Sequence, residues 1–526
     1  MRPEFDSRYP HKKAVSQKQQ SLIDINTQNI PEYVTRVTET LEKAGFEAYL
    51  VGGSVRDLII DRKPKDWDVT TNATPEQIIP LFIKTIYENK FGTVAVVFEG
   101  NSENNSVTHE TNIVEVTPYR LETQYSDHRH PDEVKFSSKL EDDLKRRDFT
   151  INAIAMDSKG HVIDLYKGQQ DIKDKVIRTV GDANERFNED ALRMLRAVRF
   201  SVQLGFTISH ETTLGVIHNA ELIKKVSSER IRDEFIKIIN SPEPMIGIGM
   251  LQKFGLLKYI IPELEEGIGC EQGGAHKYNV FEHLLQALQH AADKNWSLEI
   301  RIAALFHDIG KPRSRRAGLK KAYTFYGHEV IGARMAQKIM ERLKFSNETT
   351  DFVVKLVRYH MFFSDTEAIT LSAVRRTIVN IGPADAKAFA GEKENHPIWD
   401  LMRIRECDRV GMAKKEAPYR LRKYHAMIEE CLRDPISVSA LKVDGNILMK
   451  ELNIKPGPRM GWILNSLLEE VLDGPNKNTR EYLDARVGEL DKLSDTDLKS
   501  LGEKAKETKQ EIENLEIKKL HKKHGV

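Results

Sequence analysis

The sequence predicts an α+β head followed by helical domains in series, and three observations support this class. First, residues 26 to 160 alternate helical periodicity with short β-rich runs, which are EAYLVGG, DWDVTT, TVAVVFE and NIVEVTPYR. Second, from about Asp182 onward the periodicity is almost wholly helical, with breaks at SPEP, EEGIG, GKP and IKPGP. Third, 526 residues are too many for one compact core, and at roughly 150 residues each they suggest about three or four domains.

The charge balance argues against a globally basic nucleic-acid binder. Lys and Arg number 80 and Asp and Glu 79, so the net charge is +1 and any polyanionic partner must be held by local patches. Hydrophobic residues make up 40% and charged residues 30%, a balance typical of a folded globular chain rather than a disordered one.

The cysteines and the N-terminal segment indicate the compartment. Cys270, Cys407 and Cys431 are odd in number, far apart and without a CxxC motif, which argues against a disulfide framework and a thiolate zinc site. Residues 1–25 lack the apolar segment of a signal peptide, and no run of about 18 apolar residues occurs in the chain. We therefore expect a cytoplasmic protein that spans no membrane and begins with a flexible extension over residues 1–25.

The first motif is LVGGSVRD, a strand that ends in Gly52 and Gly53 and leads into a helix. We expect Ser54 to cap this helix, with Asp57 three residues later as in a capping box. The glycines would let a triphosphate approach the backbone at the helix N-terminus, and Arg56 would add a bidentate contact. An ordinary strand-to-helix connection has the same features, and the short distance to the next motif favours the nucleotide site.

The second motif is DWDVTT, in which Asp66 and Asp68 alternate with Trp67 and Val69 along a predicted strand. The period of two places both carboxylates on one face, with the apolar pair buried on the other. Two carboxylates beside a phosphate loop are suitable ligands for Mg²⁺, which keeps substrate phosphates in its coordination sphere. Glu115 in IVEVTPYR is a candidate third carboxylate, or else an ordinary exposed strand glutamate.

The third motif, KRRDFTINA, gathers Arg146, Arg147, Asp148 and Asn152 within seven positions around one aromatic residue. Clustered arginines coat many protein surfaces. Beside a metal site they suit a triphosphate, and Asp148 and Asn152 would contact sugar hydroxyls or support the loop.

The fourth motif, NEDALRMLRAVRF, is predicted to be one helix with Asn188 as its N-cap. Ion pairs with Arg193, Arg196 and Arg199 would explain its charges without any function. Asp190 and Arg193, however, would offer an acceptor next to a donor on one face. Cytosine and adenine present an amino donor beside a ring-nitrogen acceptor, and uracil and guanine the reverse, so this pair would select C and A.

A second metal signature lies between residues 276 and 408. His307 and Asp308 follow an apolar run and precede Gly-Lys-Pro, with His283 on an earlier helix and Asp408 on a later one. A lone helical histidine is more often a core or surface residue than a ligand. Imidazoles combined with carboxylates suit Mn²⁺, Ni²⁺, Fe²⁺ or Zn²⁺ better than Mg²⁺.

Five motifs carry a family resemblance over roughly residues 30 to 265. GGSVRD, DWD, RRDFTINA, RFNEDALRMLRAVRF and SSERIRDEF resemble, in order and spacing, those of the class II tRNA nucleotidyltransferases, the CCA-adding enzymes related to bacterial poly(A) polymerases. The resemblance implies a polymerase-β-like nucleotidyltransferase head with a mixed sheet, then a helical neck and body that hold tRNA. It implies that Asp66 and Asp68 bind Mg²⁺ and that Glu189, Asp190 and Arg193 template the base. The triphosphate would be held by Gly52, Gly53, Ser54, Arg56 and Arg147, and Asp148 would meet the ribose. Asn152 and Arg196 are further candidate nucleotide-binding residues.

The middle segment resembles the HD phosphohydrolase superfamily. Its metal-ligand order His…His-Asp…Asp is met by His283, His307, Asp308 and Asp408, and His328 and His360 occupy the places of extra histidines in two-metal members. Some bacterial CCA-adding enzymes carry such a domain, linked there to phosphatase or phosphodiesterase activity.

The C-terminal part of the chain continues the resemblance. Residues 438 to 483 are similar to the helical tail of the CCA-adding family, and the charged stretch from Leu493 to Val526 is expected to be a solvated helix or a frayed tail. The expected domains are 26–160 (head), 161–265 (neck and body), 266–432 (HD) and 433–526 (tail).

The leading hypothesis is therefore template-independent, Mg²⁺-dependent addition of CTP and ATP to a tRNA 3′ end. Alternatives with the same chemistry are an A-adding enzyme, a CC-adding enzyme and a poly(A) polymerase. The segments IVEVTPYR and YSDHRHPDEVKF resemble the CCA-adding pattern, and the second argues against addition of CC alone. An HD phosphohydrolase with a non-catalytic head is a further alternative, against which the complete DWD and EDxxR motifs argue. A structural RNA-binding protein would show a basic excess that this chain lacks.

Overall fold

The structure, a computed structural model, describes residues 27–88, 92–99, 111–122, 134–273, 277–317, 323–361, 369–382, 397–410, 418–432 and 441–501. The expected N-terminal extension and most of the YSDHRHPDEVKF segment lie outside these residues. The chain divides into two compact units, Met1–Val226 and Ser227–Val526, which are described one at a time.

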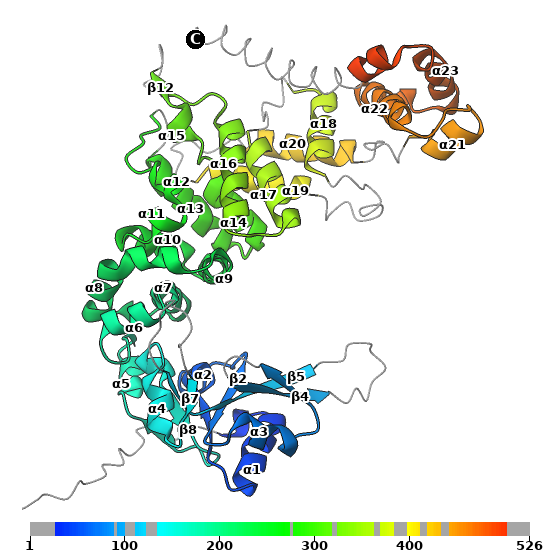
Figure 1. The fold of residues 1–526 in the computed structure, drawn as a ribbon. Helices are drawn as coiled ribbons and strands as arrows, with labels where there is room; N and C mark the ends of the chain where they lie inside the picture. The colour runs from blue at the N-terminus through cyan, green and yellow to red at the C-terminus, as the bar shows by residue number, and fades with distance from the viewer. Residues whose placement is uncertain are drawn as a thin grey trace, which may run out of the picture. The chain divides into compact units, whose positions relative to one another are not determined.

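The first unit is built on a mixed seven-stranded sheet with the strand order β3-β4-β5-β2-β1-β8-β9 (Figure 1). Neighbouring strands are antiparallel except for the parallel pair β2–β5. The four β-rich runs predicted from the sequence contain β1, β2, β4 and β5, so these predictions are confirmed. The strands of the sheet are β1 (Ala48–Val51), β2 (Trp67–Thr71), β3 (Thr85–Glu88), β4 (Thr93–Glu99), β5 (Thr111–Pro118), β8 (Ile154–Met156) and β9 (Val162–Asp164).

Eight α-helices accompany this sheet in the described part of the first unit. They are α1 (Glu32–Lys43), α2 (Gly53–Ile59), α3 (Pro75–Ile78), α4 (Leu140–Lys145), α5 (Gly168–Lys173), α6 (Ala183–Glu189), α7 (Leu192–Leu204) and α8 (His210–Asn219). Two short ribbons pair β6 (Arg120–Glu122) with β7 (Val134–Phe136) and β10 (Val176–Ile177) with β11 (Thr207–Ile208). A 3₁₀ turn, Thr150–Asn152, precedes β8.

A hydrophobic core of this unit lies on one face of the sheet, and a smaller cluster that includes Val51 and Ala155 lies on the other. Val34, Val37 and Leu41 recur at helical spacing on α1 and are fully buried in the same cluster as Trp67 and Val69 of β2. Because side chains alternate along a strand, burial of this pair turns Asp68 to the opposite face. The predicted alternation is therefore confirmed for Trp67, Asp68 and Val69, whereas Asp66 precedes the strand, so its placement on the same face as Asp68 stays a prediction.

The predicted start of α2 is wrong. The helix begins one residue before Ser54, and its N-cap is Gly52, whose φ of 81° is accessible to glycine at little cost. Ser54 lies inside the helix, where its Oγ donates a hydrogen bond to the carbonyl oxygen of Val51 at 3.1 Å. Asp57 does not close a capping box and instead accepts hydrogen bonds from Arg56.

The single helix predicted from Asn188 is two helices. Asn188 lies in the last turn of α6, which ends at Glu189, and Asp190 is extended with φ −142° and ψ 104°. Asp190 Oδ1 accepts the N–H of Leu192 at 3.1 Å, which provides a partner for one of the free N–H groups at the start of α7. Asp190 therefore stands at the break, and Asn188 is not an N-cap.

The second unit is helical apart from one small hairpin, β12 (Arg316–Ala317) with β13 (Tyr323–Thr324), within the residues described. This confirms the helical pattern expected after the head. Its first helices are α9 (Ser228–Ile239), α10 (Pro244–Lys253), α11 (Leu257–Ile260), α12 (Pro262–Glu265), α13 (Val280–Asp293), α14 (Leu298–Phe306), α15 (Lys311–Ser314) and α16 (His328–Arg342). They are followed by α17 (Asn347–Tyr359), α18 (Leu371–Ile381), α19 (Ile398–Asp408), α20 (Pro418–Cys431), α21 (Gly445–Lys450), α22 (Pro458–Asp473) and α23 (Arg480–Leu490).

The C-terminal helices enclose a small core of their own, to which Leu483, Val487 and Leu498 contribute buried side chains. Leu493 packs against the same cluster. The expectation that the chain is solvated from Leu493 onward is therefore wrong for Leu493 and Leu498, because their apolar side chains complete this core; residues 502–526 lie outside the described part.

Two expectations drawn from composition can be compared with the structure. Cys270, Cys407 and Cys431 are buried and free, so no disulfide joins them. Among the described residues, none of the helices combines the length and apolar character that crossing a bilayer demands.

Candidate active site and metal centre

Three sequence motifs of the head meet at Gly52. A Cβ atom added at Gly52 would lie 2.8 Å from Arg147 Nη1 and 3.5 Å from Asp68 Oδ2. The guanidinium therefore lies against the backbone of the glycine turn, and a carboxylate of DWD lies beside it. A side chain at this position would clash with Arg147 and strain the positive φ.

Asp68 and Asp66 hold different positions at the start of β2. The strand begins at Trp67, so Asp66 is an exposed residue immediately before it, while Asp68 is partly buried. Burial raises the pKa of Asp68, the Arg147 guanidinium opposes this shift, and the neighbouring Asp66 carboxylate adds to it. A cation between the two carboxylates would offset the cost of burying the charge on Asp68 and the repulsion between Asp66 and Asp68. The pair therefore fits a hard divalent metal ion.

Glu115 lies on the same face of the sheet as Asp68. The two residues are partners in the parallel register of β2 and β5, and Glu115 is exposed. In the described residues, the head acids do not belong to a group of three or more metal-ligating side chains whose atoms all lie within 4.8 Å. The head thus offers an open set of oxygen ligands, which substrate phosphates would have to complete.

Four of the predicted nucleotide-binding residues form a chain of hydrogen bonds that is buried except at Arg196, which is partly exposed. Arg56 Nη1 donates to Asn152 Oδ1 at 2.7 Å, Asn152 Nδ2 donates to Asp148 Oδ1 at 3.1 Å, and Arg196 Nε donates to Asp148 Oδ2 at 2.7 Å. Burial raises the pKa of Asp148, but Arg196 and Asn152 outweigh it and lower that pKa to about 2. In this structure Asp148 and Asn152 thus support the loop; contact with a sugar hydroxyl stays a prediction.

The Arg193 side chain binds Glu189, while its backbone N–H donates to the carbonyl oxygen of Asp190 at 3.0 Å. Arg193 Nη1 donates to Glu189 Oε2 at 2.6 Å, and Nη2 donates to the carbonyl oxygen of Arg146 at 3.0 Å. Asp190 precedes α7, so the predicted placement of Asp190 and Arg193 on one face of a single helix is wrong. Selection of the base by these three residues stays a prediction.

The second unit brings together every histidine and aspartate predicted for the HD site. His283, His307, Asp308 and Asp408 are buried, and one ligand atom from each lies within 4.8 Å of the others. Asp308 belongs at the same time to a second group with the buried His328 and His360. These six ligands come from α13, from the segment after α14, from the start of α16, and from the C-terminal ends of α17 and α19.

Backbone carbonyls orient three of the imidazoles. The Nδ1–H groups of His307, His328 and His360 each donate to the carbonyl oxygen of the residue three positions earlier, at 2.8, 2.7 and 2.7 Å. This bond leaves Nε2 as the basic nitrogen, and second-shell bonds of this kind fix the tautomer of metal-binding histidines.

Asp308 lies between the two sets of imidazoles. Its Oδ1 is 3.1 Å from His328 Nε2 and 3.6 Å from His360 Nε2, and its Oδ2 is 3.3 Å from His307 Nε2 and 3.5 Å from His283 Nε2. Both oxygens are buried and lack a hydrogen bond of good geometry, although Lys311 Nζ lies 2.5 Å from Oδ2. A carboxylate with each oxygen facing its own pair of imidazoles fits a ligand that bridges two metal ions.

The electrostatics of this centre differ between two of its imidazoles, because the protonated form is disfavoured at His283 and favoured at His307. Burial, and then the neighbouring His307, lower the pKa of His283 to about 4. Burial also lowers the pKa of His307, but Asp308 and Asp408 outweigh it and raise that pKa to about 10. Burial raises the pKa of Asp308, whereas Lys311 and His307 bring it well below its ordinary value. The two ionised acids thus draw cationic partners into a buried site.

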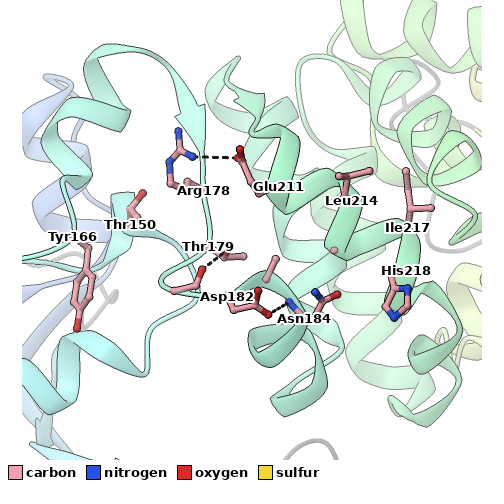
Figure 2. A pocket seen from close by; sticks show the side chains of 13 residues that line it. Thr150, Tyr166, Arg178, Thr179, Asp182, Asn184, Glu211, Leu214, Ile217 and His218 are labelled. Carbon is pink, nitrogen blue, oxygen red and sulfur yellow. Dashed lines mark hydrogen bonds and ion pairs between the residues drawn. The ribbon is translucent and has the colours of Figure 1, made fainter. Parts of the chain in front are cut away.

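A cavity in the first unit is separate from the candidate active site. It has a volume of about 890 Å³ and lies between α6, α8 and the segment that precedes α6 (Figure 2). Figure 2 shows Arg178 paired with Glu211 across it and Asp182 bound to Asn184 at the start of α6. Of the predicted motifs only Thr150 of RRDFTINA reaches its wall, and none of the predicted site residues does.

Sequence reasoning missed two charged residues at these sites. Asp143, on α4, is completely buried and binds both Arg146 and Arg147. Its spacing of three and four residues to the two arginines was the available signal. Lys311, in the Gly-Lys-Pro that follows Asp308, is buried and donates to Gln272 Oε1 at 2.7 Å.

Family profiles match four consecutive segments of the chain. They are a poly A polymerase head domain over residues 48–178, a probable RNA and SrmB-binding site of polymerase A over 205–268, an HD domain over 280–410 and a tRNA nucleotidyltransferase domain 2 over 406–487.

Related sequences and solved structures are similar to this chain over the same segments. The CCA-adding enzyme of Lactobacillus helveticus is 34% identical over 459 residues, which cover 86% of this chain and 96% of the relative. That of Geobacillus thermodenitrificans is 40% identical over 280 residues, which cover 53% of this chain and 63% of the relative. The crystal structure of the Bacillus stearothermophilus CCA-adding enzyme in complex with CTP superposes with a TM-score of 0.62 and 27% identity, over 89% of this chain and 98% of that one. The chain therefore belongs to the family of CCA-adding tRNA nucleotidyltransferases that carry an HD domain.

Proposed function

We propose that this enzyme adds C, C and A to the 3′ end of tRNA from CTP and ATP, without a nucleic-acid template and with release of pyrophosphate. The observation that carries the proposal is the meeting of the glycine turn, Asp68 and Arg147 within a few ångströms at Gly52. A phosphate-binding backbone, a metal ligand and a cation are the three parts that phosphoryl transfer requires in one place. Free cysteines fit a cytoplasmic enzyme.

In this proposal Asp66 and Asp68 hold Mg²⁺, with Glu115 beside them on the same face. When bound, Mg²⁺ lowers the pKa of an attacking hydroxyl and neutralises phosphate charge. The N–H groups at the start of α2 and the Arg147 guanidinium hold the triphosphate. The 3′ hydroxyl of the tRNA gives up its proton to solvent, its oxygen forms a bond to the α-phosphorus, the bond from that phosphorus to the bridging oxygen breaks, and pyrophosphate leaves.

Glu189, Asp190 and Arg193 select the base. The Arg193 guanidinium donates and a carboxylate accepts, which matches the Watson–Crick edges of cytosine and adenine and mismatches those of uracil and guanine. The Glu189–Arg193 bond of 2.6 Å holds the donor in place before a base arrives. The same pair would then read C and A by direct hydrogen bonding.

The test is a nucleotide-addition assay on tRNA that ends at the discriminator base. Labelled CTP, ATP, UTP and GTP are supplied singly and together, and the products are sized and sequenced. Full CCA from CTP plus ATP, and no addition from UTP or GTP, is the expected result. Addition of A alone, of CC alone or of a long A tract would instead identify an A-adding enzyme, a CC-adding enzyme or a poly(A) polymerase.

The HD domain supports a second activity, hydrolysis of phosphoesters with a transition metal such as Mn²⁺, Ni²⁺, Fe²⁺ or Zn²⁺. The observation in its favour is Asp308, each of whose oxygens faces its own pair of imidazoles. His283, His307, Asp308 and Asp408 would hold one ion, and His328 and His360 a second that shares Asp308. Metal-loaded enzyme is assayed with phosphomonoesters and phosphodiesters; if none is cleaved with any of the four metals, the domain is a scaffold for tRNA.

A further inference from the structure

Asp143 is a buried acid that binds the two arginines of the RRDF motif. Its side chain is 0% exposed, in contrast to the partly exposed arginines. Arg146 donates to Oδ1 from Nε at 3.0 Å and from Nη2 at 2.5 Å, and Arg147 Nη2 donates to Oδ2 at 3.1 Å. Each carboxylate oxygen thus holds one guanidinium.

The two Nη atoms of the Arg147 guanidinium face different groups, one the glycine turn and the other Asp143. Its Nη1 is 3.5 Å from the carbonyl oxygen of Asn152 and faces Gly52, while its Nη2 is bound to Asp143. Its Nε is buried without a hydrogen-bond partner. The bond to Asp143 is therefore the one short, charged contact that sets how this planar group is presented to the turn, among the contacts described for it.

The same two arginines stabilise the ionised form of Asp143. Burial raises the pKa of Asp143, but Arg146 and Arg147 outweigh it, so the pKa lies below its ordinary value. A buried carboxylate of this kind costs stability unless its partners are close and well oriented. Asp143 consequently keeps its charge and its hold on Arg147 throughout the neutral pH range.

We infer that Asp143 is a positioning residue for the triphosphate: it holds Arg147 across Gly52, and through Arg147 it sets the affinity for CTP and ATP alike. This inference rests on the proposed function, in which Arg147 contacts the triphosphate. Because that group is common to both nucleotides, loss of Asp143 must change their KM values together and leave the choice between CTP and UTP unchanged.

The experiment is a double-mutant cycle in the full-length enzyme with Asp143→Asn, Arg147→Ala and the combined variant. KM and kcat are measured for CTP and ATP. Asp143→Asn is expected to raise both KM values about tenfold, because the free energy of a hydrogen bond to a charged group corresponds to a change of about this size in affinity. In the Arg147→Ala background the same change is expected to have no further effect. The matched control is Asp142→Asn, which removes a neighbouring charge on α4 that pairs with Ser137 and should leave both KM values unchanged.

The outcomes separate this inference from the function on which it rests. If Arg147→Ala leaves KM unchanged, the assignment of Arg147 to the triphosphate is wrong. If Arg147→Ala raises KM but Asp143→Asn does not, or if the two effects add fully, Asp143 does not act through Arg147. Should Asp143→Asn fail to fold by circular dichroism, Asp143→Glu replaces it. That variant keeps the buried charge, but its side chain is longer by one methylene and so displaces the guanidinium. It must still raise both KM values. A KM equal to that of the wild type would overturn the inference.

Discussion

The two candidate metal sites differ in how much of the site the protein itself supplies. In the head, Asp66 is exposed, Asp68 is partly buried and Glu115 lies on the adjacent strand. In the HD domain, five buried candidate ligands already lie around a sixth, Asp308. If Asp66 and Asp68 hold a metal ion, substrate phosphates would have to complete its coordination, which would couple metal binding to nucleotide binding, whereas the HD centre would be suited to retain its metal between turnovers.

This comparison predicts its largest effect at Asp68. Asp68→Ala, and likewise Asp66→Ala, should lower CTP addition to tRNA by at least about a thousandfold, because each removes half of a two-carboxylate site that stabilises the transition state by several kcal/mol. The melting temperature should not fall, since neither side chain belongs to the core. Addition at a rate near that of the wild type in either variant would contradict the metal assignment.

The HD centre should be separable from this chemistry. His307→Ala combined with Asp308→Ala should abolish transition-metal binding, measured by calorimetry on apo protein, and with it any metal-dependent phosphoester hydrolysis. CCA addition should stay within about twofold of the wild type, because the five transfer motifs lie outside residues 276 to 408. Loss of CCA addition with unchanged circular dichroism and melting would show that the two domains are coupled.

The base-selecting residues should produce a smaller effect. Asp190→Ala or Arg193→Ala should reduce discrimination of CTP against UTP by about 1 to 3 kcal/mol, or roughly 5- to 150-fold, with little loss of tRNA affinity. Arg193→Ala should also lower the melting temperature, since its guanidinium holds Glu189 and the carbonyl of Arg146. If selectivity is unchanged in both variants, these charges serve only to join α6 to α7.

The sequence predicted which residues lie close together at the two sites better than it predicted the local backbone geometry. Alternation of Trp67 with Asp68 was enough to predict which face is buried, because strand periodicity depends on the backbone alone. Helix starts were less predictable. Asn188 is a good capping residue by type but lies in the last turn of α6, and the residue before α7 is Ala191, which is not a favoured cap.

The burial of Asp143 could not be predicted from the sequence, for a different reason. The run EDD before KRR offers several pairs at helical spacing, and the sequence alone does not indicate which of these acids is buried. In the HD segment, motif order predicted the ligands, but the position of Asp308 between two imidazole sets depends on helices far apart in the chain.

The smallest predicted effect concerns acid stability, and it tests how the head holds a buried acid without a metal. Asp148 is bound by Arg196 and Asn152, and its pKa of about 2 lies below the ordinary value of 3.8. Because the folded pKa is the lower one, the contribution of Asp148 to the free energy of unfolding is complete above the ordinary value and is lost as the pH falls toward 2. Between pH 5 and pH 2 the stability advantage of the wild type over Asp148→Asn should shrink by about 2 kcal/mol.

Trp67 provides the readout, because it is the only tryptophan in residues 1–226 of the sequence. Urea unfolding would be followed by its fluorescence in a chain whose other three tryptophans are replaced by phenylalanine. Asp61→Asn removes an exposed charge from the same unit and should change the unfolding free energy by less than about 0.5 kcal/mol at either pH. A difference between wild type and Asp148→Asn that stays constant with pH would mean that folding does not lower the pKa of Asp148, so Arg196 and Asn152 would not favour its ionised form.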